Sequence, residues 1–555
     1  MNIEKSHNKK VFVIGIDGAT FDLIKPWIKE GRLPNIANIM RNGVHGLLKS
    51  TIHPLTAPAW TSFMTGKNPG KHGVFDFIIK VPGSYNVKLV DSRMRVAESL
   101  WNILGAKGKK VGVMNVPLNY PPEKVNGFLI SWMDAPGTDC EFTYPAELHN
   151  EIKKHIGKYV LTVNFNLGLD DYIKDIFNMI ENRAATANYL MKVKEWDFFM
   201  VLFSATDYVQ HAFWKYMDKN HPGHIPELAK KYGNVIRDVY EKVDEKVGYL
   251  INALPKDVNL LIVSDHGAGP LKGVVNLNRW LEQKGLLRFQ KDKRPFAIKI
   301  LKKSFIFLKR RLPVRIKGLL KSMIPEARDM LESKFLSSSI DWEGTKAFAY
   351  GAYGNIWINL KGREANGIVE PSELHALEDY ICAELLKLTD NKGQQVVEKV
   401  YKKEELYRGD FTDRAPDLIV RWVDYAYHSR QRFGEEEKEI FMDAQKMPLT
   451  NLEMNGFHKM DGIFIAKGAG IRKGVEITGA EIIDMSPTIL YMMGLPIPED
   501  MDGKVLNDIF KSECCEEGKI RTEKTATGAK KNDYEGYSES EAKKVEERLK
   551  NLGYI

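Results

Sequence analysis

The stretch that decides the fold is VFVIGIDG at residues 11–18, an apolar run that ends in Asp17 and a glycine. Two later stretches follow the same plan. FFMVLFSAT (198–206) leads to Asp207 and His211, and NLLIVS (259–264) leads to Asp265 and His266. Continuous apolar runs are typical of strands that are buried on both faces of a parallel sheet. Ligand sites of open α/β sheets form at the carboxyl ends of such strands, so we expect these side chains to meet.

Helical stretches alternate with these runs. AESLWNILGAKG (97–108), residues 171–192 and residues 227–252 have helical patterns, and KKVGVMNV (109–116) and GFLIS (127–131) between them read as strands. This βαβα alternation predicts an α/β fold with a mostly parallel, doubly wound sheet that is covered by helices on both faces.

The pattern changes after Gly273, and residues 279–335 carry basic, helical-looking sequence with no obvious buried strand. We expect helix 372–387 and strand PDLIVRW (416–422) to resume the α/β rhythm, and GIFIAKG (462–468) to close the core. We therefore divide the 555 residues into five parts. They are an N-terminal tail (1–10), a first core part (11–273), an inserted basic cap (274–345), a second core part that supplies the last metal ligand (346–515), and a linker with a short helix (516–555).

The polar residues at the strand ends are metal-ligand types. Asp207 and His211 are spaced i, i+4, which places both on one helix face. Gly267 permits the bend that adjacent Asp265 and His266 need to reach one site. His458 stands just before the strand GIFIA.

Each group alone has a plainer interpretation. Asp17 could cap a helix, and Asp207 and His211 could be a surface carboxylate and a buried imidazole that are not in contact. The pair at 265–266 could be a polar strand exit, and His458 could be a loop histidine. Together they offer more donors than one ion needs, which indicates two metal ions.

Thr56 in TAPAWTSFMTG (56–66) is the candidate nucleophile. A hydroxyl is a weak nucleophile near neutral pH, and metal coordination can activate it by lowering its pKa. Thr61, Ser62 and Thr65 are rivals. Ser62 and Thr65 fall on the helix expected after Pro58, where packing or backbone bonding is their more common use.

As an ordered set, these residues resemble the metal site of the alkaline phosphatase superfamily. TGKNPGKHGVFDF (65–77), NVPLNYPP (115–122), APDLIV (415–420) and the stretch from Ile483 to Leu506 resemble the predicted phosphohydrolase and phosphomutase relatives of its type I phosphodiesterase/nucleotide pyrophosphatase branch. The resemblance covers roughly residues 11–510. It implies an alkaline-phosphatase-type fold with the cap inserted in it.

The resemblance also implies which residues hold the two divalent cations, zinc or manganese. One ion would be held by Asp207, His211 and His458, and the other by Asp17, Asp265, His266 and the oxygen of Thr56. In nucleotide pyrophosphatases an Asn three residues after the nucleophile binds a phosphate oxygen. Ala59 stands there in this chain, so we expect phosphate recognition to come from elsewhere, such as a backbone amide near Ala57.

The expected activity is metal-dependent hydrolysis of a small-molecule phosphoester, of phosphodiesterase or phosphatase type, through a covalent phospho-threonine at Thr56. A phosphomutase or phosphoglycerol-type phosphotransferase would use the same site with a hydroxyl acceptor in place of water. A sulfatase is disfavoured because no Cys or Ser lies in a CxPxR or SxPxR context at the nucleophile position. A silent binding module is the non-enzyme alternative, and the complete ligand set argues against it.

Composition adds weaker expectations. The net charge is +8, and there are four cysteines without a CxxC pair, which suits a reducing compartment. No signal-peptide pattern and no window of about 18 apolar residues is evident, so we expect a cytoplasmic protein. No nucleic-acid recognition motif is present. The sequence does not indicate an oligomeric state.

Residues 291–321 hold twelve Lys or Arg against one acidic residue, Asp292. Apolar residues lie between the cations, a pattern typical of helices that rest on an anionic membrane surface. A solvated cap helix and electrostatic steering of an anionic substrate remain alternatives. The protein could thus be peripheral to a membrane.

Overall fold

The computed structural model describes residues 10–290, 340–429, 439–446, 454–512, 520–524 and 536–555. The basic segment 291–321, most of the predicted cap and most of the predicted linker lie outside these residues. The domain boundaries and the membrane contact therefore stay predictions from the sequence.

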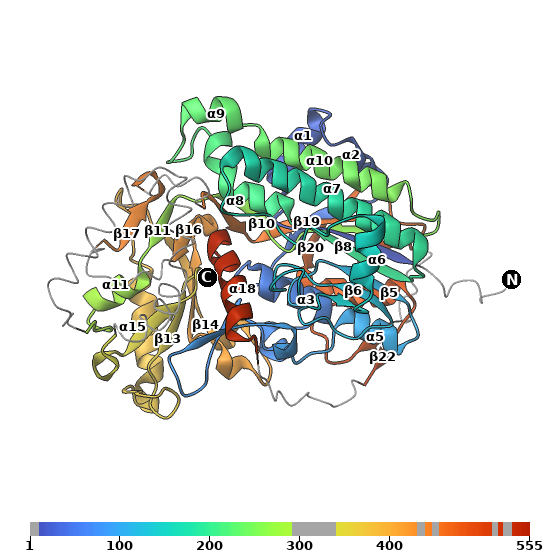
Figure 1. The fold of residues 1–555 in the computed structure, drawn as a ribbon. Helices are drawn as coiled ribbons and strands as arrows, with labels where there is room; N and C mark the ends of the chain where they lie inside the picture. Colours follow the sequence, from blue (N-terminus) through green and yellow to red (C-terminus); the bar gives the residue numbers. More distant parts are fainter. Residues whose placement is uncertain (1–9, 291–339, 430–438, 447–453, 513–519, 525–535) are drawn as a thin grey trace.

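A nine-stranded, mostly parallel sheet forms the centre of the larger part (Figure 1). Its five central strands run parallel to one another: β9 (Asn259–Val263), β1 (Val11–Ile16), β8 (Phe198–Phe203), β5 (Val111–Met114) and β6 (Gly127–Ile130). Every residue of β1, β8 and β9 is buried, as their unbroken apolar sequences predict.

The edges of the sheet break the parallel order. On one side, β19 (Asp461–Lys467) runs antiparallel to β9 and to β2 (Val44–Lys49), and β20 (Val475–Glu481) pairs parallel with β2. On the other side, β7 (Thr143–Tyr144) runs antiparallel to β6.

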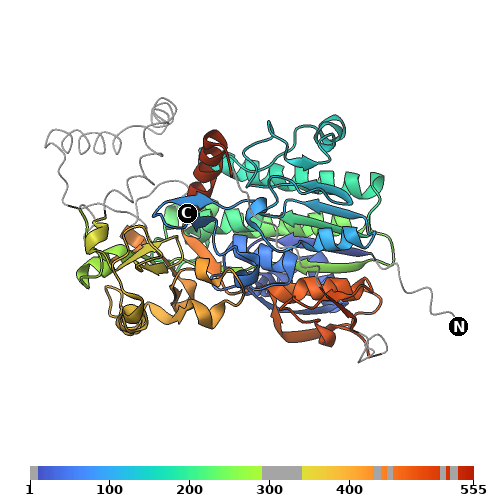
Figure 2. The same ribbon diagram turned by 90° about the horizontal axis from the view of Figure 1, so that it is seen from below.

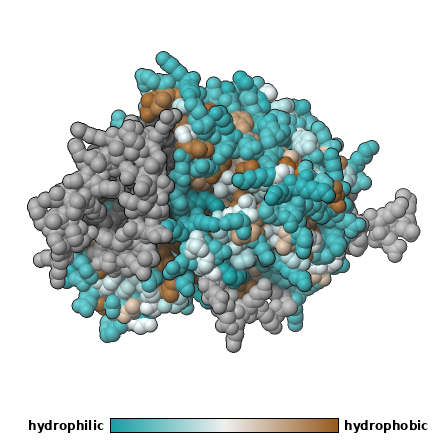
Figure 3. Space-filling view, viewed as in Figure 1, coloured by the Kyte–Doolittle hydropathy of each residue, from teal (hydrophilic) through white to brown (hydrophobic). Residues whose placement is uncertain are grey.

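Helices cover both faces of the sheet, as a doubly wound fold requires (Figures 1 and 2). One layer contains α2 (Pro34–Arg41), α7 (Leu169–Val193), α8 (Ala205–Met217) and α10 (Val235–Ile251). The opposite layer contains α3 (Thr56–Thr65), α5 (Leu100–Ala106) and α17 (Met485–Met492). The surface over α7 and α10 is mostly hydrophilic, which fits amphipathic helices that turn their apolar side to the sheet (Figure 3).

A second buried cluster of apolar side chains lies outside this sheet. It surrounds a four-stranded antiparallel sheet in the order β12 (Ala347–Tyr350), β13 (Asn355–Ile358), β15 (Leu418–Trp422) and β14 (Val397–Lys402), with α11 (Leu277–Gln283) and α15 (Leu374–Leu385).

The strand and helix expected near 416–422 and 372–387 are therefore present, but they belong to this separate sheet and do not continue the parallel one. A five-residue apolar strand looks the same in either setting, because the pattern shows burial and not the partner.

The helix expected at the end of the sequence is α18 (Glu539–Leu552). Ser538 caps it with the reciprocal Ser–Glu541 bonds of a capping box, and Gly553 ends it in the left-handed conformation. In Figure 1, α18 lies between the two parts of the molecule. None of the helices among the described residues is long and apolar enough to cross a membrane.

Candidate metal centre

The polar residues of the candidate site stand where chain segments leave buried strands. Asp17 follows β1, Asp207 lies in the first turn of α8 after β8, and Asp265 follows β9. Because these three strands are parallel neighbours, their carboxyl ends bring the three carboxylates to one edge of the sheet.

Thr56 and His458 reach this edge from other directions. Thr56 is the first residue of α3. His458 lies on β18 (Gly456–Lys459), which pairs antiparallel with β10 (Gly267–Pro270) and so stands opposite Ala268. The residue after His266 begins β10, so this strand pairing sets His266 and His458 face to face, with stacked rings 3.5 Å apart.

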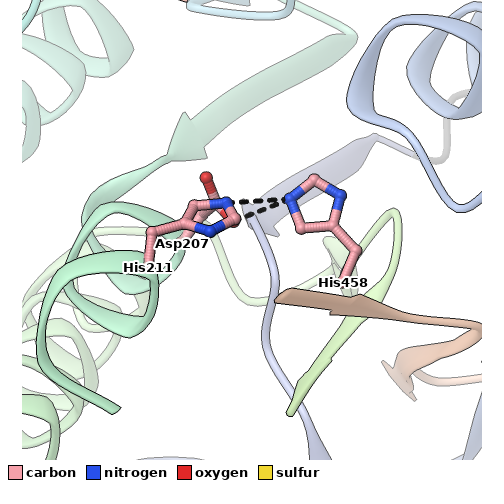
Figure 4. Close-up of side chains that lie close together, drawn as sticks. All are labelled: Asp207, His211 and His458. Atoms are coloured by element: carbon pink, nitrogen blue, oxygen red, sulfur yellow. Dashed lines mark hydrogen bonds and ion pairs between the residues drawn. The ribbon is translucent and has the colours of Figure 1, made fainter. Parts of the chain in front are cut away.

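One group of ligand atoms consists of Asp207, His211 and His458 (Figure 4). Oδ1 of Asp207 lies 3.1 Å from Nε2 of His211 and 3.3 Å from Nε2 of His458, and the two nitrogens are 3.0 Å apart. The i, i+4 spacing on α8 thus places both side chains on one face.

A second group is centred on His266. Its Nε2 lies 3.2 Å from the hydroxyl of Thr56, 3.2 Å from Oδ2 of Asp265 and 3.5 Å from Oδ1 of Asp17. Asp17 and His266 also lie close enough to Asp207 to share an ion with it, so Asp207 stands between the two groups. The structure brings all seven predicted residues together.

Each histidine is oriented by a backbone carbonyl. The Nδ1–H groups of His211, His266 and His458 face the oxygens of Gly456, Gly267 and Pro54 at 2.8–2.9 Å. A carbonyl can only accept, so each neutral ring keeps its proton on Nδ1 and turns the lone pair of Nε2 toward the site. Three lone pairs that converge in this way suit a cation.

Burial shapes the charges of the carboxylates. Burial, followed by the charges of Asp265 and Asp207, raises the pKa of Asp17 well above its usual value. Burial and the charge of Asp207 do the same to the pKa of Asp265. Burial also opposes ionisation of Asp207, but the positive charge that His211 carries when it is protonated, with hydrogen bonds from the protonated His211 and His458 rings, outweighs burial and holds the pKa of Asp207 well below the usual range. Three carboxylates this close need positive charge to ionise together.

Two buried oxygens, Oδ1 of Asp17 and Oδ2 of Asp265, have no hydrogen-bond partner. An unpartnered buried carboxylate oxygen is costly. A divalent cation would satisfy both oxygens, so the residues present fit a metal centre.

The rivals of Thr56 have other bonds. The hydroxyls of Thr61 and Thr65 donate to the carbonyls of Ala57 and Thr61 in their own helix at 2.7 Å, and Ser62 pairs with His72 at 3.0 Å. Among the four candidates, Thr56 is the one whose hydroxyl lies against the ligand cluster.

Sequence reasoning missed several partners of the cluster. Trp60 donates to Oδ2 of Asp17 at 3.2 Å, and the hydroxyl of Tyr353 lies 2.7 Å from Nδ1 of His458. Tyr554 donates to Oδ2 of Asp207 at 2.6 Å. Spacing could have suggested Trp60, four residues after Thr56 on α3. The two tyrosines give no local signal, because their contacts depend on long-range packing.

Solved structures share the fold across most of the chain. Human ectonucleotide pyrophosphatase/phosphodiesterase 5 superposes with a TM-score of 0.50 at 14% identity, over 91% of this chain and 100% of that one. Phosphonoacetate hydrolase from Sinorhizobium meliloti 1021, in complex with phosphonoformate, gives 0.53 at 14% identity, over 88% and 96%. At this identity the likeness shows the fold alone. No curated protein matches the chain.

The family described as type I phosphodiesterase/nucleotide pyrophosphatase matches residues 11–461, a range that contains all seven residues of the cluster. The nine-stranded sheet and the carboxylate–imidazole cluster at its edge agree with this match. The chain belongs to the type I phosphodiesterase/nucleotide pyrophosphatase family and is a phosphohydrolase of the alkaline phosphatase superfamily.

Proposed function

We propose that this phosphohydrolase cleaves a small-molecule phosphoester by transferring the phosphoryl group to Thr56 and then to water. The observation that carries the proposal is the position of the Thr56 hydroxyl, 3.2 Å from Nε2 of His266 in a cluster of seven oxygen and nitrogen donors.

The donor set would hold two divalent cations. Asp207, His211 and His458 would hold one ion, and Asp17, Asp265, His266 and the oxygen of Thr56 would hold the other. Bound divalent cations lower the pKa of a coordinated oxygen and stabilise the charge that develops on a transferring phosphoryl group. Carboxylate and imidazole donors suit zinc and manganese alike.

In the first step, the oxygen of Thr56 attacks phosphorus, and the proton of its hydroxyl passes through solvent to the leaving oxygen. The new Oγ–P bond forms while the bond from phosphorus to the leaving oxygen breaks, which leaves a phospho-threonine. The position of Thr56 at the start of α3 helps this step, because the N–H of Ala57 has no partner within the helix and can donate to a phosphoryl oxygen.

In the second step, a water oxygen attacks the same phosphorus and the Oγ–P bond of Thr56 breaks. Thr56 regains its proton and phosphate, or a phosphate monoester from a diester substrate, is released. If a substrate hydroxyl replaced water, the same residues would perform a phosphomutase or phosphotransferase reaction.

Trp60 would hold a metal ligand in place, and His266 would act as a neutral ligand. The indole of Trp60 fixes one oxygen of Asp17, which leaves the other oxygen turned to the site. Burial and the neighbouring His458 lower the pKa of His266 well below its usual value, so the ring stays neutral and keeps its lone pair available.

The test combines Thr56→Ala with Thr61→Ala as a matched control. Metal-loaded parent protein is mixed with p-nitrophenyl phosphate and with bis-p-nitrophenyl phosphate, and acid-quenched samples are examined by peptide mass spectrometry. We expect a phosphoryl group on the peptide that contains Thr56. Loss of a nucleophile costs on the order of 10³-fold or more in turnover.

Thr61→Ala should keep most of the activity, because that hydroxyl bonds only the backbone of its own helix in the structure. Near-parental turnover by Thr56→Ala, or a phosphoryl group on a different peptide, would contradict the proposal. The ratio of monoester to diester hydrolysis gives the preferred substrate type.

A further inference from the structure

Tyr554, beyond the end of α18, lies inside the candidate metal centre although it is 537 positions from Asp17 in the sequence numbering. Its side chain is buried, and its hydroxyl donates to Oδ2 of Asp207 at 2.6 Å. The ring stacks on Phe77 with centroids 4.9 Å apart and meets the edges of the His211 and His458 rings.

The docking of α18 explains how Tyr554 arrives there. Val545, Leu549 and Leu552 are buried, and Arg548 donates to the carbonyls of Met133 and Ala135. Before the helix, the hydroxyl of Tyr537 donates to the carbonyl of Asp134 at 2.9 Å. These bonds tie the helix to the loop that follows β6.

The turn at the end of the helix then directs the ring inward. Gly553 adopts φ +72°, and the N–H of Tyr554 returns to the carbonyl of Leu549 at 3.0 Å. A Cβ at position 553 would meet the terminal methyl group of Met454, which is the movable end of a flexible side chain. The positive φ is therefore what favours glycine at the residue that turns Tyr554 toward Asp207.

The geometry of Asp207 indicates that the bond from Tyr554 fixes the orientation of its carboxylate. Oδ1 faces Nε2 of His211 and Nε2 of His458, and Oδ2 faces away from them toward Tyr554. A carboxylate that can rotate about its Cβ–Cγ bond presents either oxygen, or both, to a cation. A hydroxyl that donates to Oδ2 keeps Oδ1 turned to the imidazoles.

We propose that Tyr554 is a positioning residue of the metal centre, which fixes the Asp207 carboxylate for the ion shared with His211 and His458. The inference rests on the proposed function, since it takes these three residues as metal ligands. It adds that the segment 536–555, which is outside the residues matched by the family, supplies a working part of the site. Hydrogen-bond partners of metal ligands usually change metal affinity by roughly 10- to 100-fold.

The test uses Tyr554→Phe, which removes the hydroxyl and keeps the ring on Phe77. Tyr537→Phe is the matched control, because it removes a hydroxyl that anchors the same segment but lies outside the cluster. For the full chain, chelated and then titrated with Zn²⁺ or Mn²⁺, calorimetry would measure the affinity of each ion. Thermal unfolding of the metal-free proteins would compare their folding.

We expect Tyr554→Phe to weaken one of the two ions roughly 10- to 100-fold, to weaken the other ion less and to lower turnover at subsaturating metal. Excess metal should restore turnover. Tyr537→Phe should change neither affinity. Unfolding of metal-free Tyr554→Phe close to that of Tyr537→Phe would show that the effect on affinity is not a loss of fold.

If Tyr554→Phe binds each ion as tightly as the parent protein does, the positioning role is overturned and the proposed function still stands. An equal loss for both ions would overturn the positioning role as well, because the ion near His266 has Asp17, Asp265 and Thr56 as further ligands and should depend less on Asp207. Parent protein that binds no metal would instead contradict the proposed function itself. Higher turnover in Tyr554→Phe with unchanged affinities would make Tyr554 an obstacle in the site and would also overturn the positioning role.

Discussion

Single residues show how burial controls charge in this protein, and Asp76 is the clearest case outside the cluster. It is 5% exposed, and its carboxylate accepts from the N–H of Phe77 and from the amide of Asn355. Burial raises the pKa of Asp76 to about 7, despite these bonds. The folded protein therefore holds this proton more tightly than the unfolded chain does.

The substitution Asp76→Asn tests that statement. A raised carboxyl pKa stabilises the fold fully below the unfolded value of 3.8, and this contribution is lost as pH rises toward 7. At 1.36 kcal/mol per pKa unit the loss is on the order of 4 kcal/mol. Asn cannot ionise, so the free energy of unfolding of the variant minus that of the parent should be more positive at pH 8 than at pH 5.

Denaturant unfolding at the two pH values measures this difference. Asp139→Asn, at an exposed carboxylate that pairs with Lys544, is the control and should show no comparable change. If the free energy of unfolding of Asp76→Asn minus that of the parent is the same at both pH values, Asp76 ionises normally.

At the scale of elements, the site depends on strand ends and on one close pairing of strands. The sequence could place Asp17, Asp207 and Asp265 because each directly follows an apolar run, and strand exits of a parallel sheet lie together. His458 was harder to place, because only the pairing of β10 with β18 brings it to the site. The start of β19 leaves little room beside β10, since a Cβ on Gly267 would lie 2.3 Å from the carbonyl oxygen of Asp461.

Gly267→Ala should therefore move β10 away from the start of β19 and displace His266 from His458. Overpacking of this kind costs on the order of 1–3 kcal/mol. We expect a lower unfolding temperature and weaker binding of both ions, because the two histidines belong to different groups. Gly223→Ala is the control, since its Cβ would meet only ordinary contacts. Parental metal affinity in Gly267→Ala would show that the strands can separate without moving the ligands.

At the scale of the whole molecule, the cluster joins segments that are far apart in sequence. Its donors come from residue 17 through residue 458, and Tyr554 adds a contact from just beyond the end of α18. The seven donors could be named from the sequence because metal chemistry restricts residue types and the family resemblance orders them. Tyr353 and Tyr554 could not, because any buried tyrosine has the same local pattern and only the packing of the second sheet and of α18 brings these two to His458 and Asp207.

Metal binding should therefore stabilise the entire fold. A ligand that binds only the folded state, and is present at a free concentration of 100 times its Kd, adds about 2.7 kcal/mol per site to the free energy of unfolding. Chelated parent protein should unfold at a higher temperature after zinc or manganese is added.

Asp265→Asn should keep part of this increase in unfolding temperature. Asp207→Asn should lose more of it, because Asp207 lies within reach of both groups of ligand atoms whereas Asp265 contacts only the group at His266. Thermal unfolding with and without metal, with Asp139→Asn as the control, measures the increments. An equal increase in parent and Asp207→Asn would mean that the metal binds elsewhere, and a larger increment in Asp207→Asn than in Asp265→Asn would contradict the shared position of Asp207.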